Sequence, residues 1–219
     1  LFIKEVRKEM TVKCGQKCTA VRRIFVPASL IDEVQEALSN QLAKTKVGDP
    51  QVEGVRMGAL VGKDQCQDVL AQVAAIEREA ECVFGGQKAV SPLGDDVAEG
   101  AFLPPMLMRH DRPHDAHAVH EVEAFGPVST LMPYADLEEA VALTARGRGS
   151  LCCSITTYDR QAAATFVRES APMHGRILVL DRECAKESTG HGSPMPLLVH
   201  GGPGRAGGGE EMGGLRGIK

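Results

Sequence analysis

The 219-residue sequence contains no tryptophan, and aromatic residues make up only 4% of it. Aliphatic side chains must therefore form most of the hydrophobic core, and a chain of this length has room for a substantial one. No apolar run approaches the roughly 18 residues that a transmembrane helix needs. The formal net charge of −4 gives no basic excess to favour a nucleic-acid partner. These absences favour a protein that binds neither membranes nor nucleic acids.

The cysteines do not form a pattern typical of structural disulfides or zinc sites. There are seven, an odd number scattered along the chain, which fits the reducing environment of the cytoplasm. Cys14 and Cys18 have a C-x3-C spacing, and Cys152 and Cys153 are adjacent. Neither pair is matched by a second spaced pair, as structural zinc sites require.

A histidine cluster is the remaining candidate for a metal site. Its members would share one face of a helix: His110, His114, His117 and His120. Pro113 interrupts such a helix, however, and acidic neighbours make a solvated turn the better interpretation. We therefore expect no metal site. The sequence also lacks a P-loop, a G-x-G-x-x-G after a strand and a G-x-S-x-G elbow, so it contains no complete dinucleotide site or serine-hydrolase nucleophile.

Strand and helix signals alternate along the chain. Apolar runs typical of strands cover residues 21–26, 83–84, 128–132, 151–157 and 176–180. Helical spacing of apolar residues covers 1–10, 29–44, 64–76, 136–146 and 159–170, with Ser29, Asp64 and Asp159 as candidate caps. Residues 94–105 indicate a loop. Strands that alternate with helices predict an α/β fold with a mostly parallel sheet covered on both faces.

The most informative segment is Gly15-Gln16-Lys17-Cys18, just before the apolar run at 21–26. A glycine lets the backbone fold closely around a reacting carbonyl, and a thiol is already appreciably nucleophilic near neutral pH. A free cysteine is more often a small buried hydrophobe. The segment alone therefore leaves a nucleophile and a core residue as alternatives.

A second candidate lies in residues 121–128, where Glu123 stands two positions before Phe125 and a Gly-Pro turn enters a strand. The carboxylate could accept hydrogen bonds from ribose hydroxyls while the ring packs on a heterocycle. The alternative is a solvated acidic turn with Phe125 in the core.

Two glycine-containing segments follow near the end of the chain. Residues 186–194 are polar and contain His191, which makes them a candidate substrate loop. From residue 200 onward glycine dominates. This part is either a flexible tail or a loop wrapped closely around a ligand or another domain.

Together these segments resemble the aldehyde dehydrogenase family. Residues 15–18 match its G-Q-x-C nucleophile motif, and residues 121–128 are similar to its E-E-x-F-G-P-V motif. Residues 47–50, 57–61 and 102–107 match its connecting segments in the same order. The resemblance implies a three-layer αβα catalytic domain over residues 1–199, with 200–219 as a separate glycine-rich segment.

The resemblance also implies roles for individual residues. Cys18 would attack an aldehyde and carry it through a thiohemiacetal and a thioester to the acid. Glu123 and Phe125 would bind the nicotinamide cofactor, NADP or NAD, and Gln16, Lys17 and His191 are the candidate substrate-binding residues. Residues 185–194 and 201–219 are similar to a branch that acts on CoA-linked semialdehydes in phenylacetate and benzoate degradation. The implied partners are a small aldehyde, with a CoA thioester as one form, and further copies of the chain in a homo-oligomer.

In that family the general-base glutamate, the oxyanion asparagine and the cofactor domain all precede the nucleophile motif. The sequence also has no initiator methionine. We therefore expect the chain to begin inside a longer protein and to be catalytically incomplete alone. Two alternatives stay open: a module that only packs against partner subunits, and a thiol-redox module that uses Cys14 and Cys18.

Overall fold

The structure is a computed structural model that describes residues 1–86, 91–95, 97–193 and 200–207. The chain divides into two compact units, one formed by Ile3–Tyr134 and one by Ala135–Lys219 together with Leu1–Phe2. No helix of the described residues is both long enough and apolar enough to span a bilayer.

A four-stranded sheet forms the centre of the Ile3–Tyr134 unit. Its strand order is β1 (Arg23–Pro27), β4 (Val128–Tyr134), β3 (Met106–Arg109) and β2 (Glu81–Phe84). β1 and β3 both run parallel to β4, and β2 is antiparallel to β3. The sheet is thus mostly parallel, as predicted.

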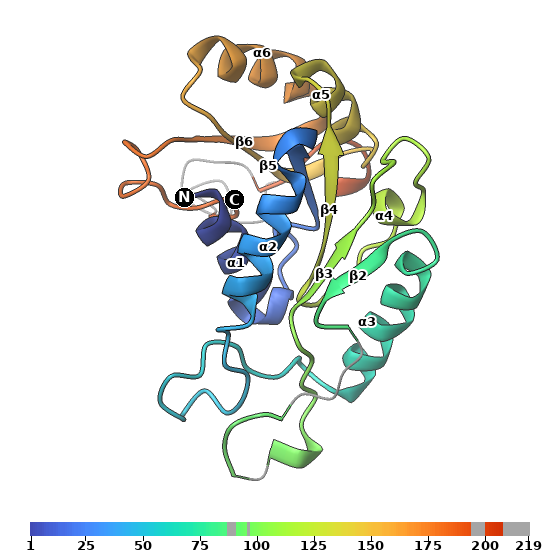
Figure 1. Ribbon diagram of the computed structural model, residues 1–219, viewed down its shortest axis with the longest axis vertical. Helices are drawn as coiled ribbons and strands as arrows, with labels where there is room; N and C mark the ends of the chain where they lie inside the picture. The colour runs from blue at the N-terminus through green and yellow to red at the C-terminus, as the bar shows by residue number, and fades with distance from the viewer. Residues whose placement is uncertain (87–90, 96, 194–199, 208–219) are drawn as a thin grey trace, which may run out of the picture. The chain divides into compact units, whose positions relative to one another are not determined.

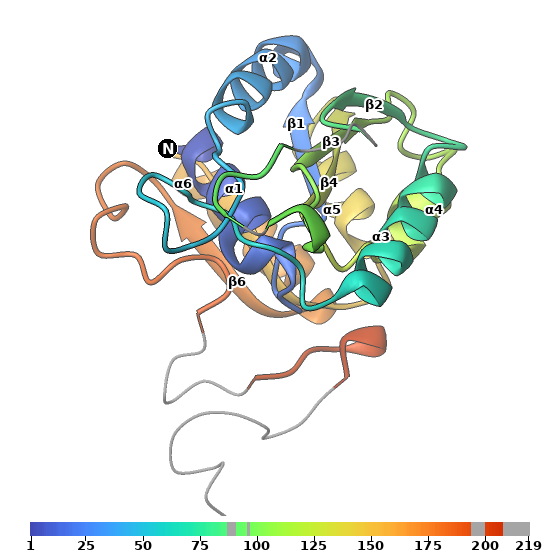
Figure 2. The same cartoon turned by 90° about the horizontal axis from the view of Figure 1, so that it is seen from below.

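Helices cover both faces of this sheet. α3 (Lys63–Ile76) and α4 (Ala118–Glu121) lie on one side, with α1 (Phe2–Thr11) and α2 (Ile31–Leu42) on the other (Figures 1 and 2). Met106 and Met108 of β3 belong to the same buried cluster as Val69 of α3. Leu107 between them is also buried, and the alternation of side chains along a strand directs it to the opposite face. The three-layer αβα arrangement is therefore confirmed.

The start of α2 differs from the sequence prediction. A 3₁₀ turn over Ala28–Leu30 precedes the helix, and Ser29 lies inside this turn. The N-cap position is occupied by Leu30, which makes no capping side-chain bond, so the prediction of Ser29 as the cap was wrong. Asp64 lies in the first turn of α3 rather than at its cap, where its charge still favours the helix dipole.

The Ala135–Lys219 unit contains a two-stranded parallel sheet of β5 (Ser150–Thr156) and β6 (His174–Leu180). α5 (Leu137–Ala145) and α6 (Arg160–Ser170) lie on the same side of this pair (Figure 1). The carboxylate of Asp159 accepts hydrogen bonds from two backbone N–H groups in the first turn of α6, which confirms it as the cap.

The glycine-rich segment packs against its own unit over the described residues 200–207. The backbone N–H of Arg205 donates a 3.0 Å hydrogen bond to the carbonyl oxygen of Arg148. A Cβ at Gly175 of β6 would overlap the carbonyl oxygen of Gly201. This close approach favours a packed segment over a free tail for these residues. Residues 194–199 and 208–219 lie outside the described residues, so a domain boundary at 199 stays a prediction.

Candidate active site

The loop that carries Cys18 begins with an unusual backbone turn after α1. Lys13 and Cys14 both have positive φ values, 53° and 55°, and Gly15 follows with 67°. A Cβ at Gly15 would overlap the carbonyl oxygen of Gly126, so this position needs glycine for both its conformation and its close packing. The loop is therefore pressed against the segment that precedes β4.

The side chains of the two residues before Cys18 form a hydrogen bond or an ion pair with other residues of the same unit. The Gln16 side-chain oxygen accepts a 3.0 Å hydrogen bond from Val61 N–H, and its amide nitrogen donates a 3.2 Å bond to Lys13 O. The Lys17 ammonium lies 2.7 Å from the carboxylate of Glu9, whose side chain is 4% exposed. Gln16 and Lys17 were expected to bind substrate. The structure shows them fixing the loop, and their contact with substrate stays a prediction.

Cys18 itself is exposed, whereas Cys14 is only 2% exposed and belongs to the hydrophobic cluster. Burial, with a smaller contribution from Cys66 nearby, raises the pKa of Cys14 to about 12. The Cys14 thiol therefore stays protonated at neutral pH, where only a thiolate reacts. This arrangement supports Cys18 as the nucleophile and disfavours the thiol-redox alternative.

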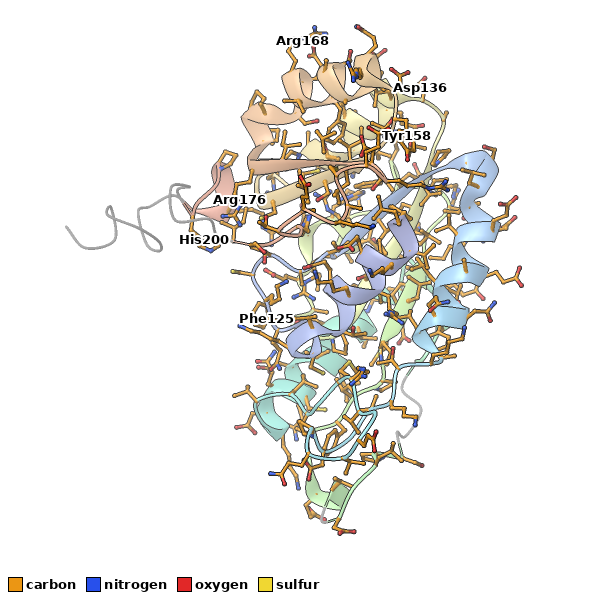
Figure 3. All side chains as sticks on the ribbon, turned by 90° about the vertical axis from the view of Figure 1, so that its left-hand side faces the viewer. Phe125, Asp136, Tyr158, Arg168, Arg176 and His200 are labelled. Atoms are coloured by element: carbon orange, nitrogen blue, oxygen red, sulfur yellow. The ribbon has the colours of Figure 1, made fainter. Side chains whose placement is uncertain are left out.

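The second motif lies on the segment that leads into β4. The Glu123 side chain is 46% exposed, and the ring of Phe125 is half-buried (Figure 3). The side-chain amide of Gln65 on α3 donates a 3.0 Å hydrogen bond to Phe125 O, which fixes the backbone at the ring. The motif thus presents an accessible carboxylate and part of an aromatic surface.

Arg22 connects the two motifs, and the sequence analysis did not identify it. Its guanidinium donates hydrogen bonds to Gly126 O at 2.6 Å, to Gly15 O at 2.7 Å and to Lys17 O at 3.3 Å. One side chain therefore holds the backbone of the cysteine loop and the backbone before β4 together. The only sequence signal for it is a pair of arginines, Arg22 and Arg23, within the apolar run at 21–26.

The charge of Arg22 also faces both motifs. Its guanidinium carbon lies 5.5 Å from the centre of the Phe125 ring, and its Nε is 3.8 Å from the carboxylate of Glu123. Burial lowers the pKa of Arg22, while the negative charges of Glu123 and Cys18 act to raise it. An arginine remains protonated in such a setting, so a positive charge stands beside both groups.

Sheet topology explains why these distant segments meet. β1 and β4 are parallel neighbours with Arg23 paired to Thr130. The segments that precede the two strands therefore end at the same edge of the sheet. This is the amino edge, whereas most open α/β sheets bind ligands at the carboxyl edge.

His191, the third residue expected to bind substrate, belongs to the Ala135–Lys219 unit. Its Nδ1 is hydrogen bonded at 2.6 Å to Ser154 Oγ on β5. Nearby, Arg176 donates a 3.0 Å hydrogen bond to Cys152 Sγ and lies 3.4 Å from His200 Nδ1 (Figure 3). The substrate role of His191 stays a prediction.

The candidate metal-binding histidines contact separate backbone groups. His110 Nδ1 lies 2.5 Å from Glu79 O, and His120 Nε2 lies 2.8 Å from Pro113 O. Within the part of the chain that the structure describes, no group of three or more His, Cys, Asp or Glu residues is placed to hold a metal ion.

Comparison with known proteins identifies the family. The 3,4-dehydroadipyl-CoA semialdehyde dehydrogenase of Aromatoleum evansii is 45% identical over 203 residues, which cover 93% of this chain and 39% of that protein. Protein MaoC of Klebsiella aerogenes is 49% identical over 164 residues, 74% of this chain and 47% of that protein. The chain thus spans less than half the length of these two relatives.

The fold is shared with solved structures at lower sequence identity. Betaine aldehyde dehydrogenase from Staphylococcus aureus, solved in complex with NAD+, superposes with a TM-score of 0.79 at 21% identity, over 99% of this chain and 40% of that one. The sequence of residues 1–212 matches the model of the aldehyde dehydrogenase family. With the cysteine loop and the glutamate–phenylalanine segment held together at one sheet edge, this chain belongs to the aldehyde dehydrogenase family.

Proposed function

We propose that this chain supplies the nucleophile and part of the cofactor site for the NAD(P)-dependent oxidation of an aldehyde to a carboxylic acid. The observation that carries the proposal is the exposed Cys18 on a loop that Arg22 ties to the segment bearing Glu123 and Phe125. A reactive thiol, a carboxylate and an aromatic ring are thereby gathered at one edge of a rigid sheet.

In the proposed reaction the Cys18 thiolate attacks the aldehyde carbon. A sulfur–carbon bond forms, and the carbonyl π electrons move to oxygen to give a thiohemiacetal oxyanion. Collapse of the oxyanion re-forms the carbonyl and expels a hydride, which leaves a thioester on Cys18. Water then adds to the thioester, the carbon–sulfur bond breaks, and the carboxylate leaves as the thiolate is regenerated, with both protons of the water released to solvent.

The residues before β4 fit a nicotinamide nucleotide. A bound NAD(P)+ would supply the acceptor for the hydride. The carboxylate of Glu123 is accessible and can accept hydrogen bonds from ribose hydroxyls. The half-buried ring of Phe125 has an apolar surface that can pack near the nicotinamide, while the guanidinium of Arg22 lies over the ring.

The name of one relative is the basis for the proposed substrate class. The Aromatoleum evansii protein is named for a CoA-linked semialdehyde, and the identity of 45% extends over nearly the whole chain. We infer a semialdehyde substrate, with a CoA thioester as its activated form. Cytoplasmic location, a role in aromatic catabolism and assembly of a homo-oligomer belong to the same proposal.

A protection experiment tests this function on the chain as it is. The protein is treated with iodoacetamide, and the alkylation of each cysteine is followed by peptide mass spectrometry with NADP+, with a semialdehyde or with neither. Both compounds should slow the labelling of Cys18. Labelling of Cys184, a half-buried thiol in the other unit, should not change and serves as the internal reference.

Two variants assign the protection to the proposed site. Glu123→Gln and Phe125→Leu should weaken protection by NADP+ and leave protection by the semialdehyde in place. If neither compound slows the labelling of Cys18 in the unaltered chain, the proposed function is wrong.

A further inference from the structure

Arg22 is a largely buried side chain whose guanidinium bonds to two separate segments of the chain. Three backbone carbonyls accept hydrogen bonds from its terminal nitrogens, those of Gly15, Lys17 and Gly126. Two of these belong to the loop that carries Cys18, and the third belongs to the turn that follows Phe125. A planar guanidinium with several donors in fixed directions suits such a three-way bridge, and the single ammonium of a lysine does not.

The Nε atom of Arg22 is positioned differently from the terminal nitrogens. It is buried without a hydrogen-bond partner, and the carboxylate of Glu123 lies 3.8 Å away. At this separation the two groups attract mainly as charges. The side chain of Arg22 is 18% exposed, so solvent screens this attraction less than it would on the surface.

We propose that Arg22 is a positioning residue. It holds the Cys18 loop and the Glu123–Phe125 segment at a fixed separation and shares one positive charge between the Cys18 thiolate and the Glu123 carboxylate. The inference rests on the proposed function, because it explains how the nucleophile and the cofactor-binding groups keep their relative geometry.

Charge sharing has a consequence that a purely structural role lacks. The guanidinium Nε lies 3.8 Å from the Glu123 carboxylate, and a terminal nitrogen bonds at 3.3 Å to the carbonyl of Lys17, the residue before Cys18. Removing the Glu123 charge leaves more of the Arg22 field for the thiolate, whereas removing the Arg22 charge leaves the thiolate beside an unopposed carboxylate. The two substitutions should therefore change the reactivity of Cys18 in opposite directions.

The test measures the rate of Cys18 alkylation at neutral pH in the full chain, without cofactor. Arg22→Gln should slow this rate about fivefold, and Glu123→Gln should raise it about twofold. In the double variant Glu123→Gln should recover part of the rate lost in Arg22→Gln, because it removes the carboxylate that is left unopposed. Arg22→Lys should recover part of the rate, since it restores the charge but not the three-way bridge.

Arg23→Gln is the matched control. Arg23 is the next residue, and its guanidinium lies at the same distance of 5.5 Å from an aromatic ring, that of Phe25. Its guanidinium also lies 3.2 Å from His120 Nδ1 on α4. This variant should leave the alkylation rate of Cys18 within twofold of the unaltered chain.

Misfolding of Arg22→Gln is recognised separately, since it would expose the buried Cys14 and increase its labelling. If Arg22→Gln does not fold, the alkylation rates of Cys18 in Arg22→Lys and Glu123→Gln test the inference instead. Small methylguanidinium ions should also restore Cys18 alkylation in a folded Arg22→Ala variant, which a missing structural contact elsewhere would not explain.

Equal rates in the unaltered chain, Arg22→Lys and Glu123→Gln would overturn the inference. So would changes of the same sign in Arg22→Gln and Glu123→Gln. These outcomes are independent of the protection by NADP+ that tests the proposed function. A chain with the expected alkylation rates but no protection would retain the role of Arg22 and refute the cofactor assignment.

Discussion

The guanidinium of Arg22 and the carbonyl oxygen of Gly126 are joined by a 2.6 Å hydrogen bond across 104 positions of the sequence. The bond is possible because Arg22 directly precedes β1 and Gly126 closely precedes β4, and these strands are parallel neighbours. The candidate site is thus assembled by the central pairing of the sheet. Changes to the loops on either side should affect reactivity and stability in ways that can be separated by experiment.

Among the cysteines of the Ile3–Tyr134 unit, Cys18 should be alkylated fastest at neutral pH. It is exposed, whereas burial raises the pKa of Cys66, and burial with the nearby charge of Glu77 raises that of Cys82. Both raised values reduce the reactive thiolate. Time-resolved alkylation with peptide mass spectrometry measures the order directly. Faster labelling of Cys66 or Cys82 than of Cys18 would contradict the assignment of the nucleophile.

The free energy of unfolding should decrease at alkaline pH because of Cys14. Below a pH of about 8.5 this thiol is protonated in both states and adds no pH dependence. At higher pH the unfolded chain loses the proton, while the folded chain keeps it until the pH reaches the folded pKa of about 12. Folding is therefore progressively disfavoured across this window, by up to about 4 kcal/mol at its upper end.

Cys14→Ala removes this effect, so denaturant unfolding of both proteins between neutral pH and pH of about 10 checks it. At neutral pH the variant should be less stable by about 1 kcal/mol, because it loses a buried sulfur atom. As the pH rises, the difference should shrink and then reverse. A difference that stays constant with pH would show that Cys14 ionises equally in both states.

Gly15→Ala should destabilise the chain by about 3 kcal/mol, since the new Cβ meets the backbone carbonyl of Gly126 in addition to the cost of the positive φ. Gly54→Ala separates the two contributions. Gly54 also has a positive φ, 85°, but a Cβ there would only reach the end of the Lys46 side chain, at 3.4 Å. That variant should lose about 1 kcal/mol. Equal losses in thermal unfolding would exclude the close contact at Gly15.

Glu9→Gln should cost about 2 kcal/mol, because it removes the charge that pairs with the Lys17 ammonium at 2.7 Å in a largely buried setting. Glu5→Gln on the same helix is the control, since its pair with Lys8 is longer, at 3.9 Å, and more exposed. Its loss should be within about 0.5 kcal/mol. The Glu9 variant should also label faster at Cys18 as the loop loosens, and unchanged labelling would show that this pair does not fix the loop.

Much of the fold could be predicted from the sequence because its periodic signals are strong. The helix capped by Asp159 and the strand that begins at Val128 were both identified from local pattern. β3 (Met106–Arg109) was missed, because it is a short strand that follows two prolines in a segment that indicates a loop. A strand of this length is identified mainly by its neighbours in the sheet.

The candidate site could be predicted in part for a related physical reason. Cys18 and Phe125 were found because their local motifs are distinctive. Arg22 was not found, because its hydrogen-bond partners are backbone carbonyls, which every residue carries. The different exposure of Cys14 and Cys18 likewise accompanies the left-handed backbone turn over Lys13, Cys14 and Gly15, which side-chain identity does not specify.

The parallel pairing of β1 with β4 also limits how this protein can vary. Since Arg23 is held opposite Thr130, the lengths of the loops from Cys18 to β1 and from Phe125 to β4 determine where the thiol lies relative to the aromatic ring. Inserting or deleting one residue in either loop would therefore change the positions of the sulfur and the ring relative to the guanidinium that bridges them. Side chains of these loops outside the two motifs can be substituted, but the number of residues in each loop must stay the same.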